Sequence, residues 1–149
     1  MDPVPMDDPH DLERFVDAQR DDYDHALSEI AAGHKRTHWM WYVFPQVAGL
    51  GSTSNAKDYA IRSKAEALAY VGHPVLGPRL LEIAQAALAV SGRTAREIFG
   101  SPDDAKLRSC ATLFASVLPT SPVFDQLLVK YFAGVRDERT IHLLETSIP

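Results

Sequence analysis

Apolar residues recur three and four positions apart along most of this 149-residue chain, in short segments that glycine or proline interrupts. This spacing gathers apolar side chains on one face of a helix. No segment alternates apolar and polar residues over the length of a strand, and no Asn-Gly hairpin turn is present. The sequence therefore predicts an all-α fold, with about six to eight short helices in one compact domain.

Capping signals and helix stops mark where these helices begin and end. A first helix is expected from Asp11 to a stop at Gly33, weakened where Gln19 takes the apolar face. Residues 47–56 are rich in glycine and hydroxyl groups and predict a loop. The other expected helices span about residues 63–70, 79–91, 94–99, 101–117, 121–133 and 137–145. Two of them begin with capping-box spacing, at Ser63 with Glu66 and at Thr94 with Glu97.

Length and composition indicate a single folded domain. A chain of this size buries enough apolar surface to fold without a disulfide or a metal, and 46% hydrophobic with 23% charged residues is ordinary globular composition. Residues 1–10, rich in proline and aspartate, are predicted to form a disordered tail, and residues 11–149 one helical domain. The single cysteine, Cys110, lies on an apolar helix face and is predicted to be a packed thiol.

The negative charge is concentrated at one end of the chain. Residues 1–29 hold ten acidic residues and two arginines, whereas residues 30–149 hold ten acidic and thirteen basic residues. The acidic segment is predicted to be the solvated face of the first helix, with a basic protein partner as the alternative. The mildly basic remainder predicts no broad nucleic-acid-binding face, but it is compatible with a local site for one anionic group.

Nothing in the sequence predicts export or a membrane. No basic-then-apolar signal segment opens the chain, and no apolar run approaches the roughly 20 residues that span a bilayer. We therefore expect a soluble, cytoplasmic protein.

The densest aromatic stretch reads HWMWYVFPQ, from His38 to Gln46. Most of its rings are expected in the core, since aromatic side chains bury large areas. Consecutive positions cannot all point to the same side, so Trp39 or Trp41 is expected to face a groove and stack on a planar base, with Lys35 nearby. His38 and Gln46 would form hydrogen bonds with that base.

A glycine-rich segment and several basic residues are the candidate phosphate contacts. The segment GLGSTS begins at Gly49 and contains Gly51 and Ser52, whose backbone amides and hydroxyl can hold an anion. It lacks the Gly-Lys-Ser/Thr ending of a P-loop, and no recognisable strand precedes it, so a simple flexible loop is the alternative and no cofactor is predicted. The candidate cations are Arg79, Lys106 and Arg108.

Three histidines form the metal-site alternative. His34 and His38 are four positions apart, as two ligands on one helix would be, and His73 supplies a third imidazole. No acidic residue lies between the first two, so the zinc-protease pattern is absent. We predict no metal, and a structural or substrate-binding role for these histidines.

The chain resembles one bacterial family along most of its length. The resemblance runs from about Leu12 to about Leu144 and rests on the strings HWMWYVFPQ, GLGSTS, YAIRS, HPVLGPRL, IFGSPDDAKLRSCATLF and a closing D-x-x-T. The chain is identified as a member of the domain of unknown function eighteen-ten, whose members often carry the label calpastatin. The resemblance implies a compact helical domain and no established activity. A calpain inhibitor of that kind is a long disordered repeat chain, which this composition contradicts.

The order of features is more distantly similar to small helical N-glycosidases that act on phosphoribosylated or ADP-ribosylated compounds. The early helix of that family reads roughly Glu-His-aromatic-aromatic-Gln, where His38 and Trp39 match and Thr37 replaces the glutamate. Glycoside cleavage normally needs a carboxylate, which another residue would have to supply. The candidate catalytic residues are His38, Asp58, Asp103, Asp104 and Asp137.

Two functions follow from these patterns. The first is binding of a nucleotide or ADP-ribose-like small molecule, with N-glycosidase activity as its catalytic extension. It predicts that the candidate residues converge on one concave pocket. The second is a non-enzymatic interaction module that uses the acidic first helix or an aromatic patch. It predicts an exposed apolar patch of about several hundred square ångströms.

Overall fold

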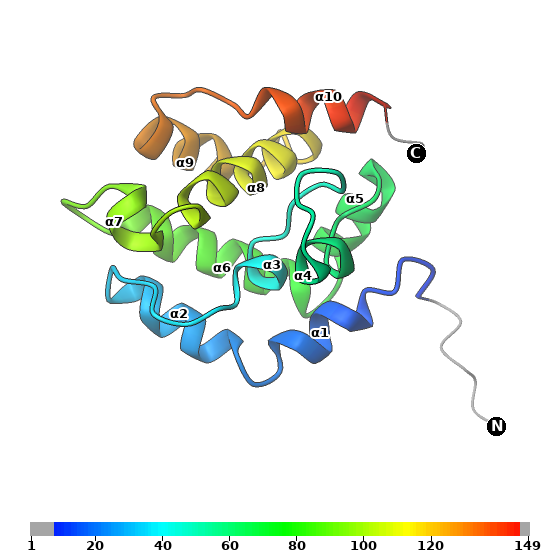
Figure 1. The fold of residues 1–149 in the computed structure, drawn as a ribbon, viewed down its shortest axis with the longest axis horizontal. Helices are drawn as coiled ribbons and strands as arrows, with labels where there is room; N and C mark the ends of the chain where they lie inside the picture. The colour runs from blue at the N-terminus through cyan, green and yellow to red at the C-terminus, as the bar shows by residue number, and fades with distance from the viewer. Residues whose placement is uncertain (1–7, 147–149) are drawn as a thin grey trace.

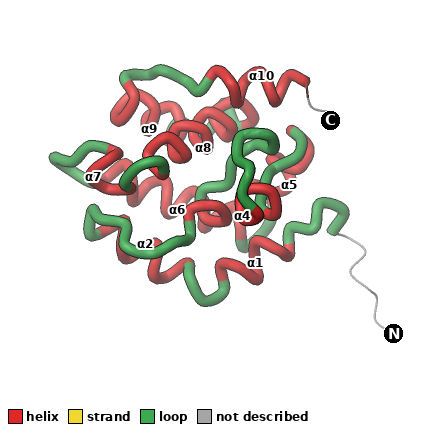
Figure 2. Tube along the Cα trace, viewed as in Figure 1, coloured by secondary structure: helices red, strands yellow, loops and turns green. Residues whose placement is uncertain are grey.

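The structure is a computed structural model that describes residues 8–146. The described residues form ten helices and no β-strand (Figures 1 and 2). The all-α prediction is confirmed, but the helices are more numerous than expected. Most of the predicted disordered tail falls on residues 1–7, which lie outside the described residues.

The additional helices are short, and they lie before residue 59. The segment expected to form one first helix forms two. A further helix lies in the aromatic stretch, and another lies in the segment predicted to be a loop. In chain order the helices are α1 (Glu13–Gln19), α2 (Tyr23–Ala31), α3 (Met40–Val43), α4 (Ser54–Asp58), α5 (Lys64–Gly72), α6 (Leu76–Ala89), α7 (Ala95–Phe99), α8 (Asp103–Val117), α9 (Val123–Phe132) and α10 (Glu138–Thr146).

The division between α1 and α2 follows from Gln19, the polar residue on the apolar face. Its side chain is buried, and its amide nitrogen donates to the carbonyl oxygen of Tyr42 at 2.7 Å and to the hydroxyl of Tyr70 at 3.1 Å. A buried amide is costly unless it finds partners. Gln19 finds them in the core, and α1 ends at this residue.

Local side-chain caps account for two of the short helices. The Thr53 hydroxyl accepts from the backbone N–H of Ala56 and starts α4 inside the segment predicted as a loop. At α7 the predicted capping box is confirmed, since Thr94 and Glu97 each accept from the other's backbone N–H. Both helices therefore begin through contacts between residues three positions apart.

Helices α6 and α8 form the centre of the molecule. In Figure 1 they lie between α1 and α2 on one side and α9 and α10 on the other. Helix α8 packs on α5, α7, α9 and α10, and helix α6 packs on α2, α5 and α9. Cys110 of α8 is buried, which raises the pKa of its thiol and confirms the predicted packed cysteine.

The exposed apolar surface does not contain the aromatic patch of the interaction-module alternative. Of the four aromatic residues between positions 39 and 44, three are buried and Trp41 is half-buried. The large apolar side chains exposed in the described part of the chain are Leu68, Val75, Val129 and Val135. An aromatic docking patch is therefore not found among these residues, because most of the aromatic rings of this segment are packed in the core.

A buried ion pair joins α1 to α5. The Arg14 guanidinium donates to the Glu66 carboxylate at 2.6 Å and to the carbonyl oxygen of Ala60 at 2.8 Å. The Glu66 side chain is only 1% exposed, and Arg62 is its second cationic partner. The capping box predicted at the start of α5 is only half formed. The Ser63 hydroxyl accepts from the backbone N–H of Glu66, but the Glu66 carboxylate binds the two arginines instead of capping the helix.

We expect Glu66→Ala to lower the free energy of unfolding by about 3–5 kcal/mol, because it leaves the half-buried Arg14 without its carboxylate. Urea unfolding followed by tryptophan fluorescence measures the change. The matched control is Glu145→Ala, which removes an exposed carboxylate near the end of α10. Equal effects of the two substitutions would show that the ion pair contributes nothing specific.

Candidate functional site

Two adjoining cavities lie where the N-terminal half of α8 faces the segment from residue 35 to residue 51. The first, about 370 Å³, is named the Trp41 cavity, and the second, about 240 Å³, is named the Gln46 cavity. Both are lined by Pro102 and Lys106, so they meet at the start of α8. Together they are called the groove.

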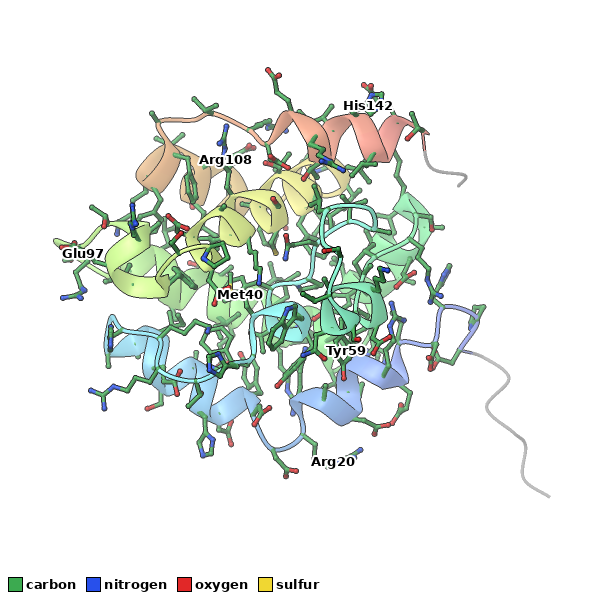
Figure 3. All side chains as sticks on the ribbon, in the orientation of Figure 1. Arg20, Met40, Tyr59, Glu97, Arg108 and His142 are labelled. Carbon is green, nitrogen blue, oxygen red and sulfur yellow. The ribbon has the colours of Figure 1, made fainter. Side chains whose placement is uncertain are left out.

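The polar and aromatic lining of the two cavities comes from segments far apart in the sequence. The Trp41 cavity is lined by Lys35, Arg36, His38, Trp41, Asp103 and Lys106. Met40 of α3, which is labelled in Figure 3, lines the same cavity. The Gln46 cavity is lined by Gln46, Gly51, Lys106, Ser109, Asp137 and Arg139.

Asp103, in the first turn of α8, holds two lysines in the Trp41 cavity. One carboxylate oxygen lies 2.8 Å from the Lys35 ammonium and the other lies 3.2 Å from the Lys106 ammonium. The Lys35 side chain is 6% exposed. A charged group that is this well shielded from water needs an oppositely charged partner. The Asp103 carboxylate is that partner for Lys35, and it also pairs with Lys106.

The same two lysines lie over tryptophan rings. The Lys35 ammonium is 5.0 Å from the ring centroid of Trp39, and the Lys106 ammonium is 5.3 Å from that of Trp41. These are cation–π distances. The half-buried Trp41 ring thus forms a wall of the cavity, with an ammonium group on one of its faces.

Glu29 of α2 shapes the segment that carries Lys35, Arg36 and His38. Its carboxylate accepts from the backbone N–H groups of Arg36 and Thr37, from the Thr37 hydroxyl at 2.7 Å and from the Trp39 indole N–H at 2.8 Å. Burial acts to raise the pKa of Glu29, but the hydrogen bonds to its charged form outweigh burial and lower the pKa to about 2.

The Gln46 cavity contains polar groups with unused hydrogen-bonding capacity. The Gln46 carboxamide makes no hydrogen bond to any described residue. Asp137 accepts from Ser109 and from the backbone and hydroxyl of Thr140, always through Oδ2, which leaves Oδ1 without a protein partner in the described chain. Arg139 donates to the carbonyl oxygen of Gly49 at 3.1 Å and pairs with no carboxylate among these residues.

The groove brings together about half of the residues that the sequence singled out. It contains the predicted binding residues His38, Trp41, Gln46, Gly51 and Lys106. It also contains two of the candidate catalytic carboxylates, Asp103 and Asp137. Residues of distant segments therefore line two adjoining cavities, whereas the other half of the predicted residues lies outside them.

The expected stacking role of Trp39 is wrong. Its side chain is 1% exposed, because its indole N–H binds Glu29 and its ring packs near Phe44 in the core. No face of this ring is available to a ligand. Trp41, in contrast, lines the Trp41 cavity.

The two predicted arginines serve the fold instead of the groove. Arg79 donates to the side chain of Gln19 at 3.3 Å and lies over the ring of Tyr23, away from both cavities. Arg108 donates to the carbonyl oxygens of Val135 and Arg136, both at 2.9 Å, and so holds the connection between α9 and α10 (Figure 3). Both carbonyl groups lie outside the helices, where such groups need partners other than a helical N–H.

Four further predicted residues lie outside the groove lining. Gly49 contributes its carbonyl oxygen to Arg139, and Ser52 is exposed in the following loop. Asp58 is exposed at the end of α4, and Asp104 accepts from the N–H of Ala105 in its own helix turn.

The three histidines of the metal-site alternative are not brought together. His38 lines the Trp41 cavity, His34 lines a cavity beside α2, and His73 lines a third cavity near residues 8–13. No group of three metal-ligating side chains occurs in the described ranges. The Nδ1 atom of His73 instead accepts from the backbone N–H groups of Val75 and Leu76 at the start of α6.

The cavity near residues 8–13 is larger, about 770 Å³, but its chemistry disfavours an anion. Asp8, Asp11 and Glu13 line it, and His10 and His73 are the basic groups there. The groove, lined by more cations than carboxylates, is therefore the better site for the anionic ligand that the sequence predicts.

Sequence reasoning did not single out Arg36, Ser109 or Arg139 as site residues. Arg139 lies inside the D-x-x-T string formed by Asp137 and Thr140, so that string was the available signal. Arg36 and Ser109 carry no comparable local pattern, and only the packing of α8 against the preceding loops shows their position.

Residues 9–144 match the family described as "Protein of unknown function (DUF1810)". The chain belongs to this family. A solved structure, the conserved hypothetical protein Rv1873 from Mycobacterium tuberculosis, is similar to this DUF1810 chain with 50% sequence identity and a TM-score of 0.92. The similarity covers 94% of this chain and 100% of the Rv1873 chain.

No curated protein matches this DUF1810 chain at a significant level. The more distant similarity to N-glycosidases stays a prediction, since neither match bears on it. No helix in the described part of the chain combines the length and the apolar character that a membrane span requires.

The low pKa of Glu29 predicts acid-sensitive stability. Because the pKa falls from 4.5 to about 2 on folding, the stabilisation is complete above pH 4.5 and is lost as the pH falls toward about 2. Urea unfolding at a series of pH values measures this loss. We expect Glu29→Gln to reduce the pH dependence in this range, whereas the exposed Glu138→Gln leaves it unchanged. The same pH dependence in both variants would contradict the assignment.

Proposed function

We propose that this protein binds a nucleotide-like anionic small molecule in the groove. The observation that carries the proposal is the position of Lys106, which lines both cavities and lies beside the Trp41 ring. In a chain with a net charge of −5, the groove is lined by four Lys and Arg residues and only two carboxylates. Such a local excess of positive charge attracts and retains anions.

Several side chains in the Trp41 cavity have capacity for a ligand. Arg36 and His38 are exposed, and their side chains make no hydrogen bond to the described protein. Asp103 forms ion pairs with both Lys35 and Lys106. The Lys106 ammonium can therefore bind a phosphate, because Asp103 would keep Lys35 as its partner. A planar base that stacks on the lysine-bearing face of Trp41 would displace the ammonium toward that phosphate.

Ligand-dependent thermal unfolding tests this proposal. We expect NAD, ADP-ribose or ADP to raise the unfolding temperature, since a ligand at about 100 times its Kd adds about 2.7 kcal/mol. For a domain of this size the shift is several degrees. Lys106→Ala removes the central cation and is expected to abolish the shift.

The matched control is Lys57→Ala, which removes an exposed lysine of α4 that lines neither cavity. It should retain the full shift. A shift of the same size in Lys106→Ala would place the ligand elsewhere. No shift with any of the three nucleotides would contradict the proposal and would favour the alternative, in which the acidic α1 and α2 bind a basic protein partner.

N-glycosidase activity is the catalytic extension of the proposal, and Asp137 is the carboxylate that favours it. Asp103 is engaged by two lysines, whereas Asp137 lines the Gln46 cavity and its Oδ1 has no protein partner among the described residues. In the hydrolysis, the C–N glycosidic bond breaks and a water oxygen bonds to the anomeric carbon. From NAD, nicotinamide leaves as a neutral base with the electron pair of the broken bond, and one water proton is released to solvent. Asp137 would stabilise the positive charge that develops on the sugar.

We expect incubation with NAD to release nicotinamide, which liquid chromatography quantifies. Asp137→Asn should slow the release by about 100-fold or more, since removing one group that stabilises charge in a transition state typically costs about that much. Asp24→Asn, a change at an exposed aspartate of α2, is the control and should leave the rate unchanged. Binding of NAD without nicotinamide release would contradict hydrolysis of this compound and leave the binding proposal intact.

A further inference from the structure

The two cavities of the groove differ in their chemistry. The Trp41 cavity combines an aromatic wall with Lys35, Arg36 and Lys106, which suits a ring and a phosphate. Apart from the shared Lys106, the Gln46 cavity mixes a carboxamide, a hydroxyl, a carboxylate and a guanidinium group. The carboxylate and the guanidinium group of this cavity have opposite charges. The cavity is therefore suited to a polar ligand group that is not strongly anionic.

The unused hydrogen-bonding groups of the Gln46 cavity define what it can hold. The Gln46 carboxamide offers both donors and an acceptor, and Oδ1 of Asp137 offers an acceptor only. A sugar hydroxyl both donates and accepts, so it satisfies either group. A second phosphate would have to lie against the Asp137 carboxylate, and repulsion between like charges opposes that arrangement.

The size and position of the Gln46 cavity connect it to the Trp41 cavity. At about 240 Å³ it is smaller than a typical pocket for a whole ligand, which spans roughly 300–1,000 Å³. Lys106 lines it and also lines the Trp41 cavity. A group in the Gln46 cavity is therefore most simply one end of a longer molecule whose anionic link lies at Lys106.

We infer that the Gln46 cavity is a subsite for a hydroxyl-rich, sugar-like group, joined through phosphate to the part of the ligand in the Trp41 cavity. The inference rests on the proposed function and narrows its ligand class. The preferred ligands are nucleotides whose diphosphate carries a second sugar, and mononucleotides or simple nucleoside diphosphates bind less tightly. Gln46 lines the second cavity and not the Trp41 cavity, so we assign it to the sugar-like group instead of the base that stacks on Trp41. Gln46 and Asp137 determine this preference, while Lys106 binds both kinds of ligand.

Isothermal titration with ADP and with ADP-ribose tests the inference. We expect the wild-type protein to bind ADP-ribose at least about tenfold more tightly than ADP, a difference of about 1.4 kcal/mol. In Gln46→Ala the ratio of the two Kd values should fall close to one, with the Kd for ADP unchanged. Gln126→Ala, which removes an exposed carboxamide on α9, is the matched control and should keep the wild-type ratio.

A second variant guards against a folding defect in the first. Asp137→Asn keeps a side-chain oxygen to accept from the N–H of Thr140 at the start of α10, so the helix cap is retained. It removes the carboxylate, and we expect it to lower the preference for ADP-ribose as well. Thermal unfolding of each variant verifies that the fold is intact.

The possible outcomes separate this inference from the proposed function. Equal affinity of the wild-type protein for ADP and ADP-ribose would overturn the sugar subsite and leave nucleotide binding in place. An undiminished preference for ADP-ribose in both folded variants would overturn the assignment to the Gln46 cavity. No binding of either compound would overturn the proposed function, and the subsite with it.

Discussion

The carboxylate of Glu29 holds the wall on which the groove depends. Four donors from Arg36, Thr37 and Trp39 converge on it: two backbone N–H groups, a hydroxyl and an indole N–H. Through these bonds α2 fixes an irregular segment that has no helix of its own before α3. The segment then presents Lys35, Arg36 and His38 to the Trp41 cavity, while the Trp39 indole is buried behind it. A charged acceptor suits this role because hydrogen bonds to an ionised group are stronger than neutral ones.

The start of α8 forms the opposite wall, and Asp103 connects the two. Lys35 comes from the segment fixed by Glu29, and Lys106 comes from α8 itself, so their shared carboxylate joins both sides of the groove. The two lysines are partly withdrawn from water and share a single carboxylate. Withdrawal from water costs solvation free energy, and a ligand that brings further negative charge to the lysines would offset part of this cost. The local charge arrangement therefore favours anions, even though the whole chain is acidic.

The helices whose signals are local could be predicted, and those that depend on distant partners could not. Thr94 and Glu97 cap α7 across three positions, and the sequence alone shows them. The break after Gln19 was visible only as a polar residue on an apolar face, because the acceptors that satisfy its amide come from α3 and α5. In the site, Trp41, Gln46 and Lys106 were predicted because they stand in distinctive strings. Arg139 was missed because its surroundings are formed by a loop ninety positions earlier in the chain.

The sequence by itself determined the all-helical class, most helix boundaries and the set of segments from which the groove is built. These properties follow from periodicity and capping, which act over three to four residues. Only the tertiary structure decided which tryptophan is buried and which arginine serves the groove. Trp39 and Trp41 are chemically alike, and so are Arg79, Arg108 and Arg139. Each takes its role from the nearest acceptor or ring, and packing between distant segments places that partner.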